Sequence, residues 1–193
     1  MGVPMKLETT IVPGCYAIKP LLHRDFRGTL VKTFQRSKFA DLGLDSDFAE
    51  SFCTESGENV LRGMHLQLPP ADGAKLVVCL SGSVMDVALD MRRGSPAYGR
   101  AAVIELSATR YAAAYLPAGV AHGFYVLEAP ALLSYSTTNE HNPALDTGIA
   151  WNSFGFRWPC RCPRLSPRDF NLPTFAEFEN PFEYVGGEEV QVG

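Results

Sequence analysis

Apolar and polar residues alternate along several short stretches of the chain, as they do in strands that bury one face of a sheet. Within residues 84–90, Asp86 and Asp90 share one face, while the opposite face is entirely apolar. Runs of this kind, or runs rich in β-branched and aromatic residues, are bounded by Gly, Pro, Ser or Asn and occupy residues 30–34, 75–91, 100–106, 111–116, 123–128 and 131–137. We therefore expect a protein built mainly of short strands.

One early segment has helical spacing instead. Residues 35–44 carry Phe39 and Leu42 about one turn apart, and Gly43 is a typical residue at the end of a helix. From residue 151 onward, proline, arginine and aromatic residues replace the alternation, which predicts a segment that wraps the outside, with one helical turn before Pro181. Many short strands, few helices and no internal repeat indicate an all-β sandwich or barrel.

Length and composition are those of one ordinary domain. The 193 residues are 46% hydrophobic, enough for a substantial core. We predict a single domain over residues 1–193, with its core at about 15–170 and the wrapping segment and a loose acidic tail at 171–193. The formal net charge of −4 argues against a nucleic-acid or membrane surface. The first residues lack a long apolar stretch and the five cysteines are scattered, which favours a cytoplasmic protein with reduced thiols.

Two histidines stand in distinctive surroundings. His65 lies in RGMHLQ, and His122 lies in LPAGVAHGF, which resembles the P-x-G-x-x-H motif of cupin jelly-roll barrels. A metal-dependent cupin would need a second histidine on the same face of the first strand, and Gln67 occupies that position. Cys160 and Cys162 lack two further ligands for structural zinc. We therefore expect neither a metal nor another cofactor.

A histidine free of metal can act as a base. A lone histidine is most often structural, but His65 is accompanied by two cations, Arg62 and Lys75, that suit an anion or a polarised oxygen. Proton abstraction beside a carbonyl needs a base, an acid on the opposite face and a cation or donor at the developing enolate. The residue types for this chemistry are all present.

Several motifs together resemble the dTDP-4-dehydrorhamnose 3,5-epimerase family. They are DFRG, VLRGMHLQLPP, AKLVVCLSGSVMDVALDMRRGSPAYG, LPAGVAHGF, LSYSTTNEHNP, WP and LSPRD, and they extend from about Asp25 to Asp169 in the order of the family. The resemblance implies a cupin jelly-roll barrel with a few short helices. It also implies an isomerase that epimerises C3, C5 or both on a nucleotide-linked 4-keto-6-deoxy sugar, in deoxysugar or surface polysaccharide biosynthesis. A homodimer is implied, in which an early strand within residues 6–12 joins the sheet of a neighbouring copy.

The resemblance assigns catalytic roles by position. His65 is the implied base, and Asp169 pairs with its imidazole and raises its pKa. Tyr135 is implied to donate a proton on the opposite face of the sugar, provided that nearby groups lower its pKa. Lys75 is implied to lie near the ketone, where its charge stabilises an enolate more than the neutral substrate.

Other positions are assigned to substrate binding. Arg27 and Arg62 correspond to arginines that hold the diphosphate, for which planar guanidinium donors are suited. His122 corresponds to a second pocket histidine, which Asp86 could orient, and Gln67 belongs to the same set. A surface ion pair is the alternative for each arginine, and a core aromatic is the alternative for Tyr135.

The chain departs from the family pattern mainly outside the proton-transfer residues. The usual F-x-D-x-R-G-x-F-x-E is here H-R-D-F-R-G-T-L-V-K, which brings in His23 and Lys32. Glu50 and Phe52 replace the usual Gln and Asn, and His141 replaces a Tyr before N-P. Because these positions lie around the nucleoside and the outer pocket, we expect altered base recognition, with a GDP- or CDP-linked sugar as an alternative to dTDP.

Two other functions stay open at this point. A ketoisomerase of the same fold would also abstract a proton, but it would return that proton to a different carbon and shift the carbonyl. A non-catalytic carbohydrate-binding cupin would keep the phosphate-binding residues without the base or the acid. The joint presence of His65, Tyr135 and Asp169 favours the epimerase.

Overall fold

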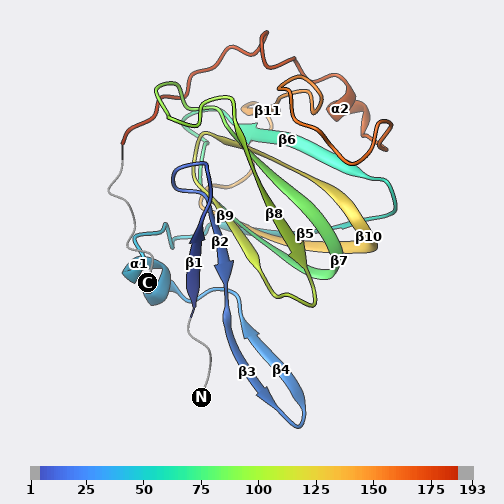
Figure 1. The fold of residues 1–193 in the computed structure, drawn as a ribbon. Coiled ribbons are helices and arrows are strands. Elements are labelled where there is room, and N and C mark those ends of the chain that lie inside the picture. Colours follow the sequence, from blue (N-terminus) through green and yellow to red (C-terminus); the bar gives the residue numbers. More distant parts are fainter. Residues whose placement is uncertain (1–4, 187–193) are drawn as a thin grey trace.

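The structure is a computed structural model that describes residues 5–186. Nine strands form one continuous antiparallel sheet that folds into two facing layers (Figure 1). The layers are joined because two long strands, β7 (Lys75–Asp90) and β10 (Val120–Thr137), pair with each other and run through both. The predicted all-β fold is confirmed.

Each layer uses one half of each long strand. In the first layer, the start of β7 and the end of β10 are flanked by β1 (Lys6–Thr9), β2 (Tyr16–Lys19), β9 (Ala113–Leu116) and β5 (Glu50–Ser56). In the second layer, the end of β7 and the start of β10 are flanked by β8 (Ala101–Ser107), β6 (Leu61–Gln67) and β11 (Asp146–Gly148). The predicted strands 123–128 and 131–137 are thus two parts of β10.

The bend between the layers depends on a glycine. Gly82 has a positive φ of 69°, and a Cβ at this position would lie 2.3 Å from the carbonyl oxygen of Glu128. Opposite it, β10 shifts register between Val126 and Leu133, as a strand does where it carries extra residues around a corner. Only glycine fits this close approach without strain.

Apolar side chains fill the space between the layers and two flanking regions. The central cluster includes Leu116, Phe124 and Leu133, all almost completely buried. A second cluster packs around Phe39 of α1 (Arg36–Asp41), which is the helix predicted at residues 35–44. Leu44 N donates to the Phe39 carbonyl after Gly43, whose φ is 67°, and this turn ends the helix.

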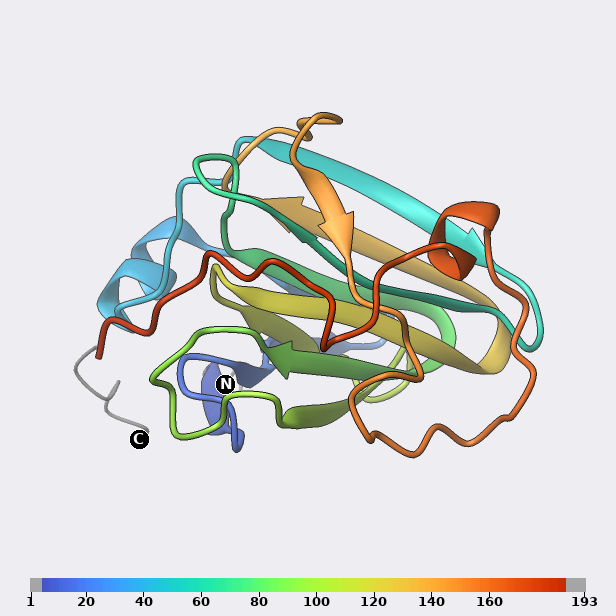
Figure 2. The ribbon, with the colours of Figure 1, turned by 90° about the horizontal axis from the view of Figure 1, so that it is seen from above.

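The C-terminal segment crosses the second layer (Figure 2). It contains α2 (Pro167–Phe170), which contacts β6, and a hydrogen-bonded turn in which Phe178 N donates to the Thr174 carbonyl. Phe182 is 4% exposed, and Tyr184 N donates to the Arg93 carbonyl, so the segment stays packed beyond Pro181, after which the sequence predicts the loose tail. Residues 187–193 of the predicted loose tail lie outside the described residues.

A small hairpin stands apart from the sandwich. β3 (Leu21–Asp25) and β4 (Gly28–Lys32) pair only with each other and project away from the two layers (Figure 1). β1 pairs with β2 of the same chain, which places the early strand in its own sheet.

Candidate active site

A cavity of about 360 Å³ lies between the two layers, within the range typical of small-molecule sites. The first layer contributes side chains from β5, from the start of β7 and from the end of β10. The second layer contributes side chains from β6, from β11 and from the start of β10, and the loop after β10 and α2 close the rim. The lining residues are Glu50, Phe52, Thr54, Arg62, His65, Gln67, Lys75, His122, Phe124, Tyr135, Thr137, Asn139, His141, Asp146 and Arg168.

His65 reaches the cavity from the middle of β6. Residues three apart on a regular strand face opposite sides, yet Arg62 and His65 both line the cavity. The pairing of β6 with β10 shifts register between His122 and Phe124, and Gly63 lies at this irregularity. A Cβ on Gly63 would lie 2.4 Å from the Gly123 Cα, so the close approach of the two strands requires glycine here.

Asp169 holds one ring nitrogen of His65. The His65 Nε2 to Asp169 Oδ1 distance is 2.6 Å, and Asp169 Oδ2 accepts a hydrogen bond of 3.4 Å from Gly63 N. Asp169 is positioned by α2, where the Ser166 hydroxyl caps the helix by accepting from Asp169 N. Since a carboxylate only accepts, Nε2 carries the proton of the neutral imidazole and Nδ1 has the free lone pair.

Burial and Asp169 act in opposite directions on the pKa of His65. Burial lowers the pKa of His65 below its usual value of 6.5 and outweighs Asp169, which raises it through its hydrogen bond and charge. Burial would raise the pKa of Asp169, but the hydrogen bond and charge of His65 hold it below its usual value. Asp169 therefore raises the pKa of His65, as the resemblance implies, but burial decides the net direction, and at neutral pH the imidazole is uncharged and able to accept a proton.

A second histidine–aspartate pair lies deeper. His122 Nε2 is 2.6 Å from Asp86 Oδ2, and both side chains are at most 5% exposed. Asp86 lies on the partly polar face of β7 that the alternation of residues 84–90 predicts, and the structure shows it completely buried. Its second oxygen, Oδ1, is buried without a hydrogen-bond partner among the described residues.

Tyr135 faces these histidines from the other layer. Its ring is stacked on Phe52 at a centroid distance of 4.8 Å and an interplanar angle of 8°, and it meets His122 edge-on at 5.9 Å. Burial raises the pKa of Tyr135, and the charge of Asp86 adds to this, while the Thr54 hydroxyl and Arg62 oppose it. The expectation that its surroundings lower this pKa is wrong, because the ring is 6% exposed and near a carboxylate.

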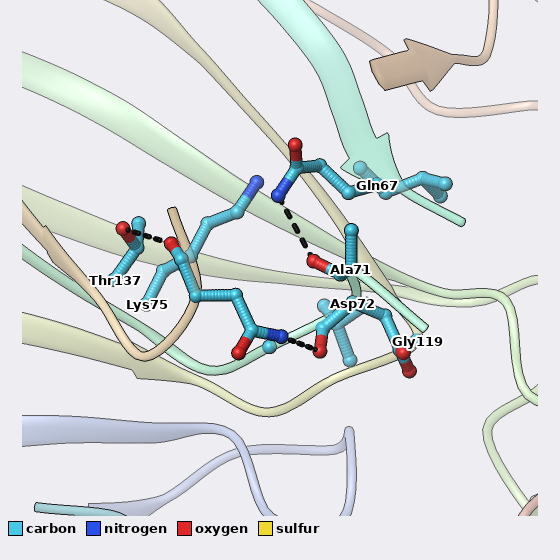
Figure 3. Close-up of a pocket in the computed structure, with 10 residues that line it drawn as sticks. Gln67, Ala71, Asp72, Lys75, Gly119 and Thr137 are labelled. Carbon is cyan, nitrogen blue, oxygen red and sulfur yellow. Dashed lines mark hydrogen bonds between the residues drawn. The ribbon is translucent and has the colours of Figure 1, made fainter. Parts of the chain in front are cut away.

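Lys75 and Gln67 line this cavity and also a smaller pocket beside the loop at residues 68–74 (Figure 3). Lys75 Nζ donates to the His65 carbonyl at 3.3 Å, and burial lowers its pKa to about 8 although the charge of Asp146 opposes this. Gln67 Nε2 donates to the Ala71 carbonyl at 2.9 Å, and Gln67 Oε1 accepts from Asn142 N at 2.6 Å. The amide of Gln67 is thus engaged in holding two loops.

Three further predicted residues line the cavity. Arg62 donates to the Ser56 hydroxyl at 2.9 Å and to the Glu55 carbonyl at 3.0 Å. Glu50 accepts from His141 N at 2.6 Å, which ties β5 to the loop after β10. These contacts fix the backbone and side-chain directions around the rim of the cavity.

The structure adds lining residues that the sequence did not indicate. Asp146 accepts from Arg168 at 2.8 Å and lies 3.1 Å from His141 Nε2, so one carboxylate joins two cationic or titratable groups at the rim. Thr54 and Asn139 also face the cavity. The charged pair would have been recognisable only from spatial proximity, because the two residues are 22 positions apart.

Three predicted binding residues do not reach the cavity of their own chain. His23, Arg27 and Lys32 lie on the β3–β4 hairpin, and none of them lines the cavity. The Arg27 side chain is 77% exposed and pairs with Asp25. Phe26, at the tip of the same hairpin, is 98% exposed.

Within residues 5–186, no group of three or more His, Cys, Asp or Glu side chains is arranged to hold a metal ion. In the same part of the chain, no helix has the length and apolar character that crossing a membrane requires.

Comparison with known proteins gives the context of this site. A family model described as dTDP-4-dehydrorhamnose 3,5-epimerase matches residues 9–177. A dTDP-4-dehydrorhamnose 3,5-epimerase of Sinorhizobium fredii is 38% identical over 188 residues, which cover 94% of this chain and 95% of that protein.

Solved structures agree with this match. The dTDP-6-deoxy-D-glucose-3,5-epimerase of Legionella pneumophila, in complex with dTDP-4-keto-L-rhamnose, has a TM-score of 0.90 at 31% identity and covers 95% of this chain and 100% of its own. A 3'-monoepimerase of Streptomyces bikiniensis, in complex with dTDP-quinovose, has a TM-score of 0.80 at 34% identity and covers 86% of this chain and 85% of its own. The predicted cupin-type fold is confirmed by this likeness.

Proposed function

The chain belongs to the dTDP-4-dehydrorhamnose 3,5-epimerase family, and from this membership we propose that it epimerises ring carbons of a nucleotide-linked 4-keto-6-deoxy sugar. It is an isomerase of the epimerase kind. One geometric feature supports the proposal most directly: His65, which is paired with Asp169, and Tyr135 reach a single cavity from opposite layers. A sugar ring between the layers would meet a base on one face and an acid on the other.

The first step is removal of a proton from a carbon beside the ketone. Neutral His65 accepts this proton on Nδ1, because Nε2 is already bound to Asp169, and the carboxylate then stabilises the imidazolium. The electron pair of the broken C–H bond moves to the ketone oxygen and forms an enolate. Lys75 would stabilise this charge in a site that is partly shielded from water.

The second step is reprotonation from the other face. Tyr135 is protonated because burial raises its pKa, and its hydroxyl gives its proton to the carbon as the enolate collapses to the ketone. The resulting phenolate is countered by Arg62, whose charge lowers the pKa of Tyr135. Exchange with solvent then restores both groups, so the cycle balances without a metal or redox cofactor.

The nucleotide is proposed to be dTDP. The matched family and both ligand-bound structures carry dTDP sugars in their names, which favours dTDP over the GDP- or CDP-linked alternatives. Arg62 and His122, both in the cavity wall, are proposed as substrate-binding residues, with Arg62 near the diphosphate. Glu50, Phe52 and His141 line the same cavity, so their departure from the family pattern bears on the bound sugar nucleotide.

Deuterium incorporation tests the function. In heavy water with dTDP-4-keto-6-deoxyglucose, NMR should show solvent deuterium at C3, C5 or both, together with an epimerised product. Tyr135→Phe should keep exchange and lose epimerisation, since the base remains while the opposing acid is removed. A product with a shifted carbonyl would instead indicate a ketoisomerase, and binding without any exchange would indicate a carbohydrate-binding cupin.

We further propose a homodimer in which the β3–β4 hairpin serves the site of the neighbouring copy. The hairpin carries His23, Arg27 and Lys32 away from its own cavity, and it presents Phe26 to solvent. An exposed apolar tip beside phosphate-binding side chains suits insertion at a partner's cavity. Light scattering should give twice the chain mass.

Mixed dimers test the sharing of the site. Arg27→Ala and His65→Asn chains should each be inactive alone, whereas a mixed dimer has one site with an intact Arg27 and an intact His65. Recovery of activity on mixing would support the exchange, and no recovery in a demonstrated mixed dimer would contradict it.

A cytoplasmic location is also proposed, since all five cysteines are free thiols, and cell fractionation would test it.

A further inference from the structure

The acid and an unusual neighbour form a stacked pair across two strands. Tyr135 of β10 and Phe52 of β5 are directly opposite in the strand register, so their side chains leave the same face of the first layer. Their rings are nearly parallel, with an interplanar angle of 8° and a centroid distance of 4.8 Å. Such an offset-stacked arrangement is favourable for two aromatic rings.

Tyr135 is held on both sides. His122 meets its ring edge-on at an interplanar angle of 67°, and His122 is itself fixed by Asp86. On the other side, Phe52 is 42% exposed while Tyr135 is 6% exposed. Phe52 is therefore the outer ring of the stack and separates the Tyr135 ring from solvent on the side of β5, an edge strand of its layer.

Phe52 departs from the pattern of the family that the chain resembles. Where that pattern carries Asn, a side chain that cannot stack in this way, this chain carries Phe52. The substitution lies two residues before Thr54, which also lines the cavity. Because alternate residues share a face, Phe52 and Thr54 together form the β5 side of the surroundings of the acid.

The direction of the Tyr135 hydroxyl decides the outcome of each enolate. An enolate that recovers its proton from His65 returns to substrate, and it carries deuterium when the reaction runs in heavy water. An enolate that receives a proton from Tyr135 becomes epimer. The ratio of exchanged substrate to epimer therefore measures how well the acid is placed, separately from how fast the base works.

We propose that Phe52 is a positioning residue for Tyr135: by stacking on its ring, it holds the hydroxyl toward the carbon and commits the enolate to epimerisation. The inference rests on the proposed function. It adds a residue that acts through the acid and touches no reacting atom itself. A ring that is free to rotate would offer its hydroxyl to the carbon for a smaller fraction of the time.

The experiment measures exchange and epimerisation together in heavy water for Phe52→Ala, Phe52→Leu and Phe52→Tyr. At saturating substrate, removing the ring, as in the first two variants, should raise the ratio of exchanged substrate to epimer about fivefold or more. Phe52→Tyr keeps a stacking ring and should restore the parent ratio. Leu127→Ala changes an apolar residue of β10 with similar exposure, 45%, and should leave the ratio unchanged.

An unchanged ratio in Phe52→Ala, with exchange intact in the parent protein, would overturn this inference alone. An equal rise in Phe52→Tyr would also overturn it, because loss of the native side chain rather than loss of the stack would then be the cause. Absence of exchange in the parent protein would overturn the proposed function and this inference with it. Parallel loss of exchange and epimerisation in Phe52→Leu would show a general structural defect and contradict the positioning role.

Discussion

The two histidine–aspartate pairs have the same geometry in different surroundings. Each joins a histidine Nε2 to a carboxylate oxygen at 2.6 Å. The His65 side chain is 27% exposed, and the second oxygen of its partner Asp169 accepts from Gly63 N. The His122 side chain is 5% exposed, and the second oxygen of its partner Asp86 has no partner within residues 5–186.

This difference separates a group that can exchange protons from one that is held in place. A histidine used as a base must reach substrate and release its proton to solvent, which His65 can do and the deeper His122 can do much less readily. An enclosed pair mainly fixes the direction of a ring, here the one that meets Tyr135 edge-on. We infer that the same contact serves proton transfer at His65 and orientation at His122.

Replacing each histidine gives the largest expected difference. His65→Asn should lower turnover about 10⁴-fold, since general-base catalysis contributes up to that amount, and deuterium exchange should disappear. His122→Asn should retain exchange but lower the free energy of unfolding by about 3 kcal/mol, because it leaves a buried carboxylate without its imidazole. NMR exchange assays and denaturant melts measure the two quantities. Equal loss of exchange in both variants would contradict the inference that His65 transfers protons while His122 only orients a ring.

Amide substitutions test the two carboxylates with matched chemistry. In Asp169→Asn, an NH₂ group placed toward Gly63 N would face another donor, so it turns toward His65. The proton of His65 then moves to Nδ1, which can no longer accept one from substrate, and turnover should fall about 10²-fold. In Asp86→Asn, the NH₂ can take the unpartnered position and leave the oxygen on His122, so turnover should change by only a few-fold.

Steady-state turnover of the two variants, with circular dichroism as a check of folding, measures this contrast. Similar losses at both positions would mean that His122 depends on its tautomer as much as His65 does. A neutral Asp169→Asn would mean that Asp169 does not set the tautomer of the base.

For the two histidine–aspartate pairs, the local pattern of the sequence predicted the strand face of Asp86 but not the contact of Asp169 with His65. Alternation in residues 84–90 placed Asp86 on the partly polar face of β7, and on this face Asp86 meets His122. Asp169 lies 104 residues from His65, so only the family resemblance connected them. A contact over that distance depends on how the C-terminal segment packs, which no local pattern determines.

Other features depend on register or on long-range placement. β5 was not predicted, since its residues ESFCTES are mostly polar and exposed, and the stack of Phe52 on Tyr135 exists only in the register that β5 adopts against β10. Asp146 and Arg168 look like solvated loop charges in the sequence and become neighbours only in the fold. Arg27 was assigned to the site from its motif, but the hairpin carries it away from the cavity of its own chain.

The pH dependence of kcat/KM gives the smallest effect and tests the more open pair in the free enzyme. His65 must be neutral to accept a proton, so kcat/KM should rise with pH through a pKa below 6.5, the value from which burial lowers it. Lys75 must be charged to stabilise the enolate, so kcat/KM should fall as pH passes about 8.

Lys75→Arg should remove the alkaline decrease, because a guanidinium with a pKa above about 12 stays charged. Lys38→Arg, an exposed lysine paired with Asp41, is the matched control and should leave both limbs in place. An alkaline limb that persists in Lys75→Arg would assign it to another group, and an acid limb above 6.5 would show that Asp169 outweighs burial at His65.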